Sequence, residues 1–153
     1  VNLFLNKVNQ DTDKKEFAIK NKKEFNSEKT LENKSVLLAD DDMRNIFALS
    51  SVLEDYNMIV EIANNGQEAL DILNQENNID IVLMDIMMPV MDGYEAMTNI
   101  RKNKSYSELP IIAITAKAMK GDKEKAIEAG ANDYISKPVD IDKLISLIRV
   151  WVS

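Results

Sequence analysis

The sequence IDIVLMD at residues 79–85 decides the fold, because an almost continuous apolar run here ends on a single acidic residue. A short run of this kind is typical of a strand that is covered on both faces of a parallel sheet. We therefore predict a buried strand over 79–84, with Asp85 standing at its carboxyl end.

Outward from this strand, apolar runs alternate with segments whose apolar residues recur at helical spacing, as Ile46, Leu49 and Leu53 do. The predicted strands are 35–39, 58–62, 79–84, 109–114 and 132–136, and the predicted helices are 43–56, 68–74, 94–102, 118–129 and 141–151. Strict alternation predicts an α/β fold, (βα)5, with a five-stranded parallel sheet. Right-handed crossovers favour a doubly wound sheet of flavodoxin-like strand order 2-1-3-4-5.

The composition excludes several classes of function. The 153-residue chain has a net charge of −7, which argues against nucleic acid as a partner. It contains no cysteine and no histidine, so disulfides, zinc sites built on these residues and a phosphohistidine on this chain are excluded. No apolar run approaches the roughly 20 residues that span a bilayer, so we expect no direct membrane contact and a cytoplasmic location.

Residues 1–33 differ in composition from the rest, being rich in Lys, Glu and Asn with isolated apolar residues such as Phe17 and Phe25. Such a stretch buries little apolar surface alone, so we predict a linker or partly helical tail before a domain at 34–153. The alternative is a helix docked on the domain or on a second copy, which leaves a homodimer open.

Polar residues stand at the carboxyl ends of four predicted strands. Asp40 and Asp41 follow the first strand, Asp85 the third, Thr115 the fourth and Lys137 the fifth. In the order 2-1-3-4-5 the direction of winding reverses between the first and third strands, and open parallel sheets bind ligands at that point. We therefore expect these five side chains to share one crevice.

Three carboxylates in one crevice repel each other, and a divalent cation would relieve that repulsion. The available ligands are oxygens, which favours Mg²⁺, or Mn²⁺, over zinc. Phosphoryl transfer to a carboxylate needs a metal, a fixed cation such as Lys137 and a donor such as Thr115. Each residue alone has an ordinary structural explanation, such as a helix cap or a surface charge, and only their joint placement favours this chemistry.

Four motifs resemble the signatures of response-regulator receiver domains. They are VLLADDD (36–42), IVLMDIMMPVMDGYEA (81–96), PIIAITAKAM (110–119) and DYISKPVD (133–140). The resemblance covers about 35–152, and the intervals of 30 and 52 residues from Asp85 to Thr115 and Lys137 are those of the family. It implies that Asp85 is the phosphoacceptor of a two-component phosphorelay.

The resemblance also implies roles for the neighbouring residues. Asp41 would bind Mg²⁺ directly, Asp40 would act through water, and Asp85 with the backbone carbonyl of Met87 would complete the protein ligands. Thr115 would bond the phosphoryl group and Lys137 would pair with it.

Three further positions take family roles. Tyr134 would be the aromatic switch that turns inward as Thr115 moves toward the phosphoryl group, an interpretation that we favour over an ordinary half-buried strand aromatic. The small Ala116 would leave room for phosphoryl donors. The peptide bond from Lys137 to Pro138 is expected to be cis.

The segments MRNIFALSSVLED (43–55) and AKAMKGDKEKAIEAGANDYISKPVD (116–140) are similar to receivers at the carboxyl end of hybrid sensor histidine kinases. Since the sequence stops soon after the last predicted helix, we expect an excised module of such a kinase, whose parent chain could be membrane-anchored. As an isolated module it would catalyse only its own phosphorylation and dephosphorylation. The donor would be a histidine kinase or a histidine-phosphotransfer domain. We predict its docking surface at Met43, Arg44, Asn45 and Ile46.

Two other classes fit the residues less well. A magnesium phosphohydrolase with an aspartyl nucleophile would carry a second Asp two residues further on, where this chain has Met87. A flavodoxin-like nucleotide binder would have a phosphate loop rich in Ser, Thr and Gly after the first strand, where three aspartates would repel phosphate. A receiver-fold scaffold that is not phosphorylated in cells stays open.

Overall fold

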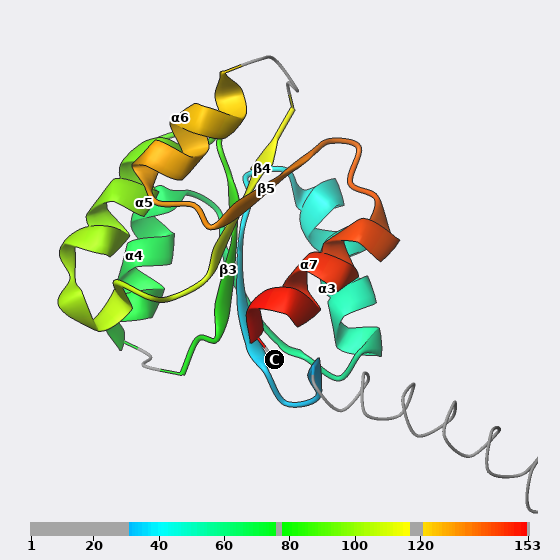
Figure 1. Ribbon diagram of the computed structural model, residues 1–153. Helices are drawn as coiled ribbons and strands as arrows, with labels where there is room; N and C mark the ends of the chain where they lie inside the picture. Colours follow the sequence, from blue (N-terminus) through cyan, green and yellow to red (C-terminus); the bar gives the residue numbers. More distant parts are fainter. Residues whose placement is uncertain (1–30, 76–77, 117–120, 153) are drawn as a thin grey trace, which may run out of the picture.

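The computed structural model describes residues 31–75, 78–116 and 121–152, and the five strands and their helices alternate along the chain as predicted (Figure 1). The elements are β1 (Ser35–Ala39), α3 (Met43–Asp55), β2 (Ile59–Ala63), α4 (Gly66–Gln75), β3 (Ile81–Asp85), α5 (Gly93–Lys102), the 3-10 helix η1 (Lys104–Tyr106), β4 (Ile111–Thr115), α6 (Asp122–Ala129), β5 (Asp133–Ser136) and α7 (Ile141–Val152). All paired strands are parallel and the order is β2-β1-β3-β4-β5, which confirms the predicted flavodoxin-like sheet.

The central strands are the most buried part of the sheet, and every residue of β3 and β4 is buried. Both strands begin two residues later than the apolar runs suggested. The Asp80 carboxylate accepts a hydrogen bond from Ser35 N at 2.8 Å, and Pro110 lacks the N–H that a strand residue would donate. The apolar runs therefore located the buried segments correctly, but the predicted strands extended two residues beyond the amino ends of the observed strands.

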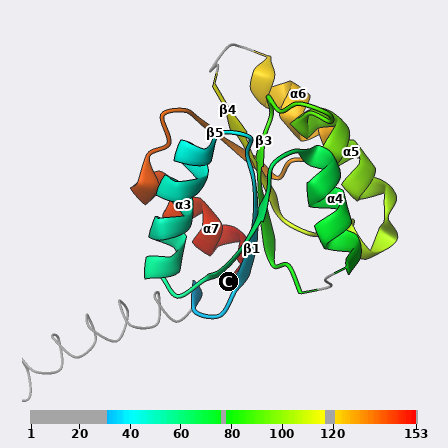
Figure 2. The ribbon, with the colours of Figure 1, turned by 180° about the vertical axis from the view of Figure 1, so that it is seen from behind.

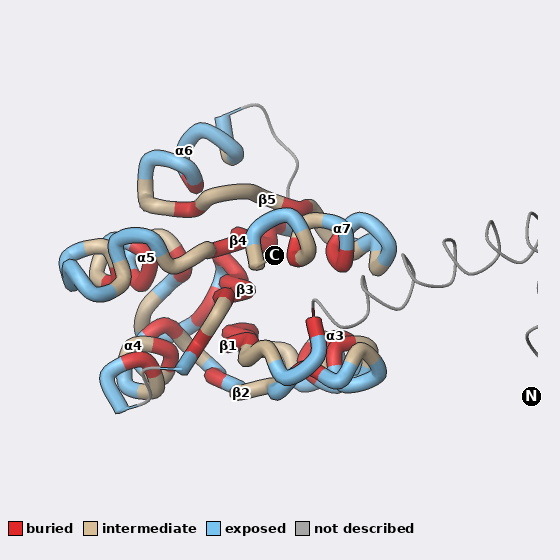
Figure 3. The backbone as a smooth tube through the Cα atoms, turned by 60° about the horizontal axis from the view of Figure 1, so that its bottom comes forward, coloured by how far each residue is buried: buried red, intermediate tan, exposed pale blue. Residues whose placement is uncertain are grey.

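Helices cover both faces of the sheet. Helices α4, α5 and α6 lie on one face and α3 and α7 on the other, as the two opposite views show (Figures 1 and 2). Each layer has its own apolar core. Leu37, Val82 and Met84 point into the first, whereas Leu38 and Leu83 point into the second. Burial is concentrated in the central strands β1, β3 and β4 and on the inward sides of the helices, whereas most residues of the edge strands β2 and β5 are not fully buried (Figure 3).

Two predicted helix boundaries have clear local causes. Asp42 caps α3, because its side chain accepts a hydrogen bond from Arg44 N at 2.9 Å. Gly130 follows α6 with a φ of 125°, a left-handed conformation that favours glycine. Helix α6 itself begins at Asp122, and residues 118–120 of the predicted helix lie outside the described residues.

The predicted tail, residues 1–33, lies outside the described residues except for its last three. Leu31 is fully buried in the layer of α3 and α7, and Asn33 N donates a hydrogen bond to Asn57 O at 2.9 Å. Residues ahead of β1 therefore contribute to the core. Among the residues described, no helix is both long enough and apolar enough to cross a membrane.

The 3-10 helix η1 was not predicted from the sequence. It lies beside Arg101, whose guanidinium donates to the carbonyl oxygens of Tyr106 and Gly130 and to Asn132 Oδ1, each at 2.7 Å. Asn132 Oδ1 also accepts from Ile111 N at 2.9 Å. This network joins α5, the end of α6 and the starts of β4 and β5, at the opposite end of the sheet from the acidic residues.

Candidate functional site

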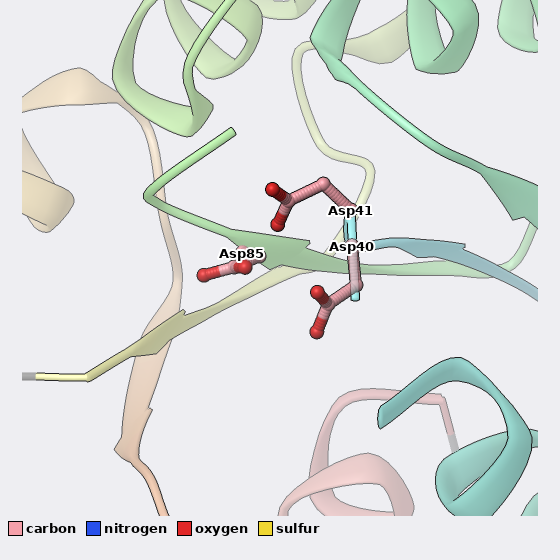
Figure 4. Close-up of side chains that lie close together, drawn as sticks. All are labelled: Asp40, Asp41 and Asp85. Atoms are coloured by element: carbon pink, nitrogen blue, oxygen red, sulfur yellow. The ribbon is translucent and has the colours of Figure 1, made fainter. Parts of the chain in front are cut away.

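Three aspartates meet at the carboxyl end of the sheet. Asp85 ends β3, and Asp40 and Asp41 follow β1, its neighbour in the sheet (Figure 4). One carboxylate oxygen from each residue lies within 4.8 Å of the others. Asp40 and Asp85 are buried, at 0% and 2% exposed, whereas Asp41 is open to solvent. The topology therefore brings together the carboxylates that the sequence analysis singled out.

Lys137, the residue that follows β5, reaches the two buried carboxylates. Its Nζ lies 3.2 Å from Asp85 Oδ2 and 3.5 Å from Asp40 Oδ2. The backbone N–H of Lys137 donates to Thr115 O at 2.7 Å, which fixes the start of its side chain against the end of β4. The following peptide bond to Pro138 is cis, as the resemblance to receiver domains implied.

The cluster of aspartates carries more negative charge than Lys137 can neutralise. Burial, and then repulsion from Asp40, raise the pKa of Asp85 to about 6, and Lys137 only partly offsets this effect. Burial opposes the charge on Lys137, but attraction from Asp85 and Asp40 outweighs it and raises the pKa of the lysine. One cation is shared between two buried carboxylates, and negative charge remains in excess.

Asp40 has one satisfied and one unsatisfied oxygen. Its Oδ1 accepts a hydrogen bond from Asp42 N at 2.9 Å. Its Oδ2 is buried and accepts no hydrogen bond from any described residue, with Lys137 as an ion-pair neighbour. A buried carboxylate oxygen whose nearest partner is a lysine shared with a second carboxylate is costly, and a further cation would lower that cost. The all-oxygen donor set and the excess negative charge fit a hard divalent ion such as Mg²⁺.

Thr115 and Tyr134 occupy neighbouring strands on one face of the sheet. Thr115 is buried at the end of β4 and pairs in register with Ser136, while Tyr134, two residues earlier on β5, pairs with Ala113. Side chains two apart on a strand share a face, and Tyr134 is half-buried against the layer of α4, α5 and α6. The hydroxyl and the ring are thus placed on the same side of the sheet.

The predicted docking surface needs one correction. Met43 is 69% exposed, and the side chain of Arg44 is 91% exposed. Ile46, however, is only 4% exposed, because it belongs to the helical stripe that packs α3 into the core. Ile46 is therefore not available to a partner. Phe47, which the sequence analysis did not select, is 74% exposed on the same helix.

A cleft of about 180 Å³ lies beside this exposed part of α3. It is lined by Asn45, Ala48, Leu49, Lys137, Pro138, Val139 and Ile141. Because Lys137 also contacts Asp85, the cleft joins the surface of α3 to the acidic cluster.

The loop between β3 and α5 completes the site. Met87 is 70% exposed, and its N–H lies 3.4 Å from Asp85 Oδ1. Gly93 N donates to Ile86 O at 2.8 Å, and a Cβ at Gly93 would lie 2.8 Å from Ile86 Cα, so only glycine lets α5 begin this close to β3. This contact was not predicted from the sequence, in which the glycine directly after Asp92 is its signal.

Residues 36–149 match the family described as the response regulator receiver domain. The chain belongs to this family. Hybrid signal transduction histidine kinase M of Dictyostelium discoideum is 41% identical over 121 residues, which are 76% of this chain and 5% of that kinase. The receiver domain of sensor histidine kinase PA1611 from Pseudomonas aeruginosa PAO1, with a magnesium ion coordinated in its active site cleft, has a TM-score of 0.73 at 32% identity, covering 78% of this chain and 98% of that one.

A second solved structure contains a partner protein. The co-crystal structure of the Saccharomyces cerevisiae histidine phosphotransfer signaling protein Ypd1 with the receiver domain of the response regulator Ssk1 matches with a TM-score of 0.72 at 33% identity, covering 79% of this chain and 90% of that one. The chain spans about half or less of the first curated relatives that it matches, at 51%, 7% and 5% of their lengths. It is a receiver domain of two-component signalling, with hybrid histidine kinases among its relatives.

Proposed function

We propose that this receiver accepts a phosphoryl group on Asp85 in a Mg²⁺-dependent reaction. The observation that carries the proposal is the joint contact of Lys137 Nζ with Asp85 and Asp40, inside a cluster of three carboxylates. Asp41, Asp40, Asp85 and the carbonyl of Met87 would hold the metal, which would supply positive charge to the transferred phosphoryl oxygens. The magnesium ion in the cleft of the P. aeruginosa receiver supports this assignment.

Asp85, Lys137 and Thr115 have separate roles in the proposed phosphoryl transfer. An Asp85 carboxylate oxygen attacks the phosphorus of a phosphohistidine, so that a P–O bond forms as the P–N bond breaks and the imidazole leaves. Lys137 stabilises charge on the phosphoryl oxygens, and Thr115 donates a hydrogen bond to one of them. Movement of Thr115 toward the phosphoryl group would draw Tyr134 inward, which would couple the site to the half-buried edge strand β5.

The donor would be the phosphohistidine of a histidine kinase or a phosphotransfer protein, and the parent protein a hybrid kinase. We place the docking surface on Met43, Arg44, Asn45 and Phe47, next to the cleft that leads to Lys137. The Ypd1–Ssk1 complex supports a partner of this class. Charge reversal in R44E and removal of the ring in F47A should each slow transfer from a phosphorylated donor, without changing phosphorylation by a small acyl phosphate.

Intact-protein mass spectrometry after incubation with a small acyl phosphate tests the chemistry directly. A single phosphoryl adduct is expected on the wild type with Mg²⁺, and none with EDTA or on Asp85→Asn. Asp71→Asn, which changes an exposed aspartate of α4, is the matched control and should be phosphorylated normally. A folded protein that binds Mg²⁺ but never gains the adduct would refute the proposal and favour a receiver-fold binding or scaffolding module.

A further inference from the structure

We propose that Gly66, the first residue of α4, is a positioning residue for the metal-binding loop between β3 and α5. The proposal rests on the proposed function, because the loop provides the carbonyl of Met87 as a metal ligand. Gly66 lies outside the acidic cluster and would contact neither the metal nor the phosphoryl group. It would act through Met91, near the far end of the loop.

The contact between Gly66 and Met91 is too close for any larger residue. Gly66 is buried, and its N–H donates to Met91 O at 3.0 Å. A Cβ at Gly66 would lie 2.7 Å from Met91 O and 2.9 Å from both Met91 Cγ and Ala96 Cβ. Because the nearest of these atoms belongs to the backbone, a methyl group at Gly66 must displace the chain at Met91.

The start of α4 is held firmly on the helix side. Asn65 O accepts from Ala69 N at 3.1 Å, Asn65 Oδ1 accepts from Glu68 N at 2.9 Å, and Asn65 Nδ2 donates to Glu68 Oε2 at 3.0 Å. This capping arrangement fixes the first turn, whose leading N–H groups have no partner within the helix. The N–H of Gly66 is one of these, and Met91 O satisfies it.

The loop itself has little freedom to absorb a displacement. At its base, Ile86 N donates to Ile114 O at 3.0 Å and Gly93 N donates to Ile86 O at 2.8 Å. Within it, proline fixes φ at residue 89, and Val90 has a φ of 68°, an uncommon conformation for a β-branched residue. A shift at Met91 is therefore passed along the loop toward Met87.

Magnesium is sensitive to shifts of this size, because it requires near-octahedral geometry at about 2.0–2.1 Å. A displacement of a few tenths of an ångström at the carbonyl of Met87 would weaken binding while leaving all three carboxylates in place. Residues that orient metal ligands typically change metal affinity by roughly 10- to 100-fold. We expect Gly66→Ala to act near the lower end of this range.

The test is a Mg²⁺ titration of Gly66→Ala, by calorimetry and by the rate of adduct formation with a small acyl phosphate. The Mg²⁺ concentration at half-maximal rate should rise roughly tenfold, while the rate at saturating Mg²⁺ stays within about twofold of wild type. Gly130→Ala is the matched control, because a Cβ there would lie 2.7 Å from Arg101 Cγ at the other end of the sheet. It should lose stability but keep the wild-type Mg²⁺ midpoint.

Hydrogen exchange on the wild-type protein tests the same coupling without a substitution. If Met91 O holds the Gly66 N–H only while the loop is in its metal-binding position, Mg²⁺ should slow exchange of the Gly66 amide, by about tenfold at ten times the dissociation constant. The Gly130 amide, bonded to Ala126 O and Ile127 O, should not respond.

The positioning role would be overturned by an unchanged Mg²⁺ midpoint in Gly66→Ala, or by a hydrogen-exchange rate of the Gly66 amide that does not change with Mg²⁺. Either result would leave the proposed function intact. A wild-type protein that does not bind Mg²⁺ at all would overturn both proposals.

Discussion

Replacing Asp85 by asparagine is expected to stabilise the metal-free protein, although it removes the proposed phosphoacceptor. Asp85 is 2% exposed, and burial followed by repulsion from Asp40 raises its pKa from 3.8 to about 6. One pKa unit corresponds to about 1.4 kcal/mol, so the ionised carboxylate lowers the free energy of unfolding by up to about 3 kcal/mol. Asparagine keeps the size of the side chain without its charge.

The effect has a defined pH window. Between pH 3.8 and about 6 the folded protein keeps a proton on Asp85 that the unfolded chain has lost, so wild-type stability falls as pH rises through this window. The stabilisation by Asp85→Asn should therefore be near zero below about pH 4 and fully present above about pH 6. We expect a stabilisation of about 1–2 kcal/mol there, below the upper bound, because Lys137 loses one of its two partners.

Urea unfolding in EDTA, followed by circular dichroism at about pH 4 and pH 7.5, measures the difference. Asp71→Asn, at an exposed position, should stay within about 0.5 kcal/mol of wild type at both pH values. Adding Mg²⁺ should stabilise the wild type more than Asp85→Asn, because the variant lacks one carboxylate ligand. An equal effect of Asp85→Asn at both pH values would refute the explanation by a buried carboxylate with a raised pKa.

Three further substitutions test other parts of the structure by urea unfolding. Lys137→Met should lower the free energy of unfolding by about 1–3 kcal/mol near pH 7.5, because it leaves the buried carboxylates without their cation. Mg²⁺ should restore part of this stability, and a loss that Mg²⁺ does not reduce would contradict the explanation. Arg101→Ala should lower the free energy of unfolding by about 2–4 kcal/mol, because it leaves the Gly130 carbonyl without its donor. An unchanged stability would show that the hydrogen bonds of Arg101 do not stabilise the fold. Leu31→Ala should cost about 2–4 kcal/mol, whereas the exposed control Glu32→Ala should be nearly neutral; equal effects would show that Leu31 is not part of the core.

The sequence predicted the fold well because burial on both faces leaves a strong pattern. Every residue of β3 and β4 is buried, and that alone requires the continuous apolar runs from which the strands were predicted. The polar residue after each run was then placed by topology, since all parallel strands end at one edge. The convergence of Asp40, Asp85 and Lys137 needed no knowledge of side-chain geometry.

What the sequence did not predict depends on contacts between elements distant along the chain. Gly66 contacts Met91, and Arg101 donates three hydrogen bonds to Gly130 and Asn132, so both contacts join segments that are far apart in the sequence and that no local pattern relates. The choice of Ile46 as a docking residue was wrong for a different reason. Its place in the buried helical stripe was visible in the sequence, and the same periodicity indicates Phe47 as the exposed neighbour.

The two ends of the sheet differ in how well their polar groups are satisfied, and this difference bears on switching. At the amino end, Arg101 donates to the partly buried carbonyls of Tyr106 and Gly130, and Leu31 is buried in the core. At the carboxyl end, Asp40 has an unsatisfied oxygen, Asp85 has a raised pKa and Val90 has a left-handed backbone. A ligand shifts an equilibrium only by the difference in its affinity for the two states. The metal and phosphoryl binding that we propose at the carboxyl end would therefore change the conformation there, while the hydrogen-bonded amino end keeps the domain folded.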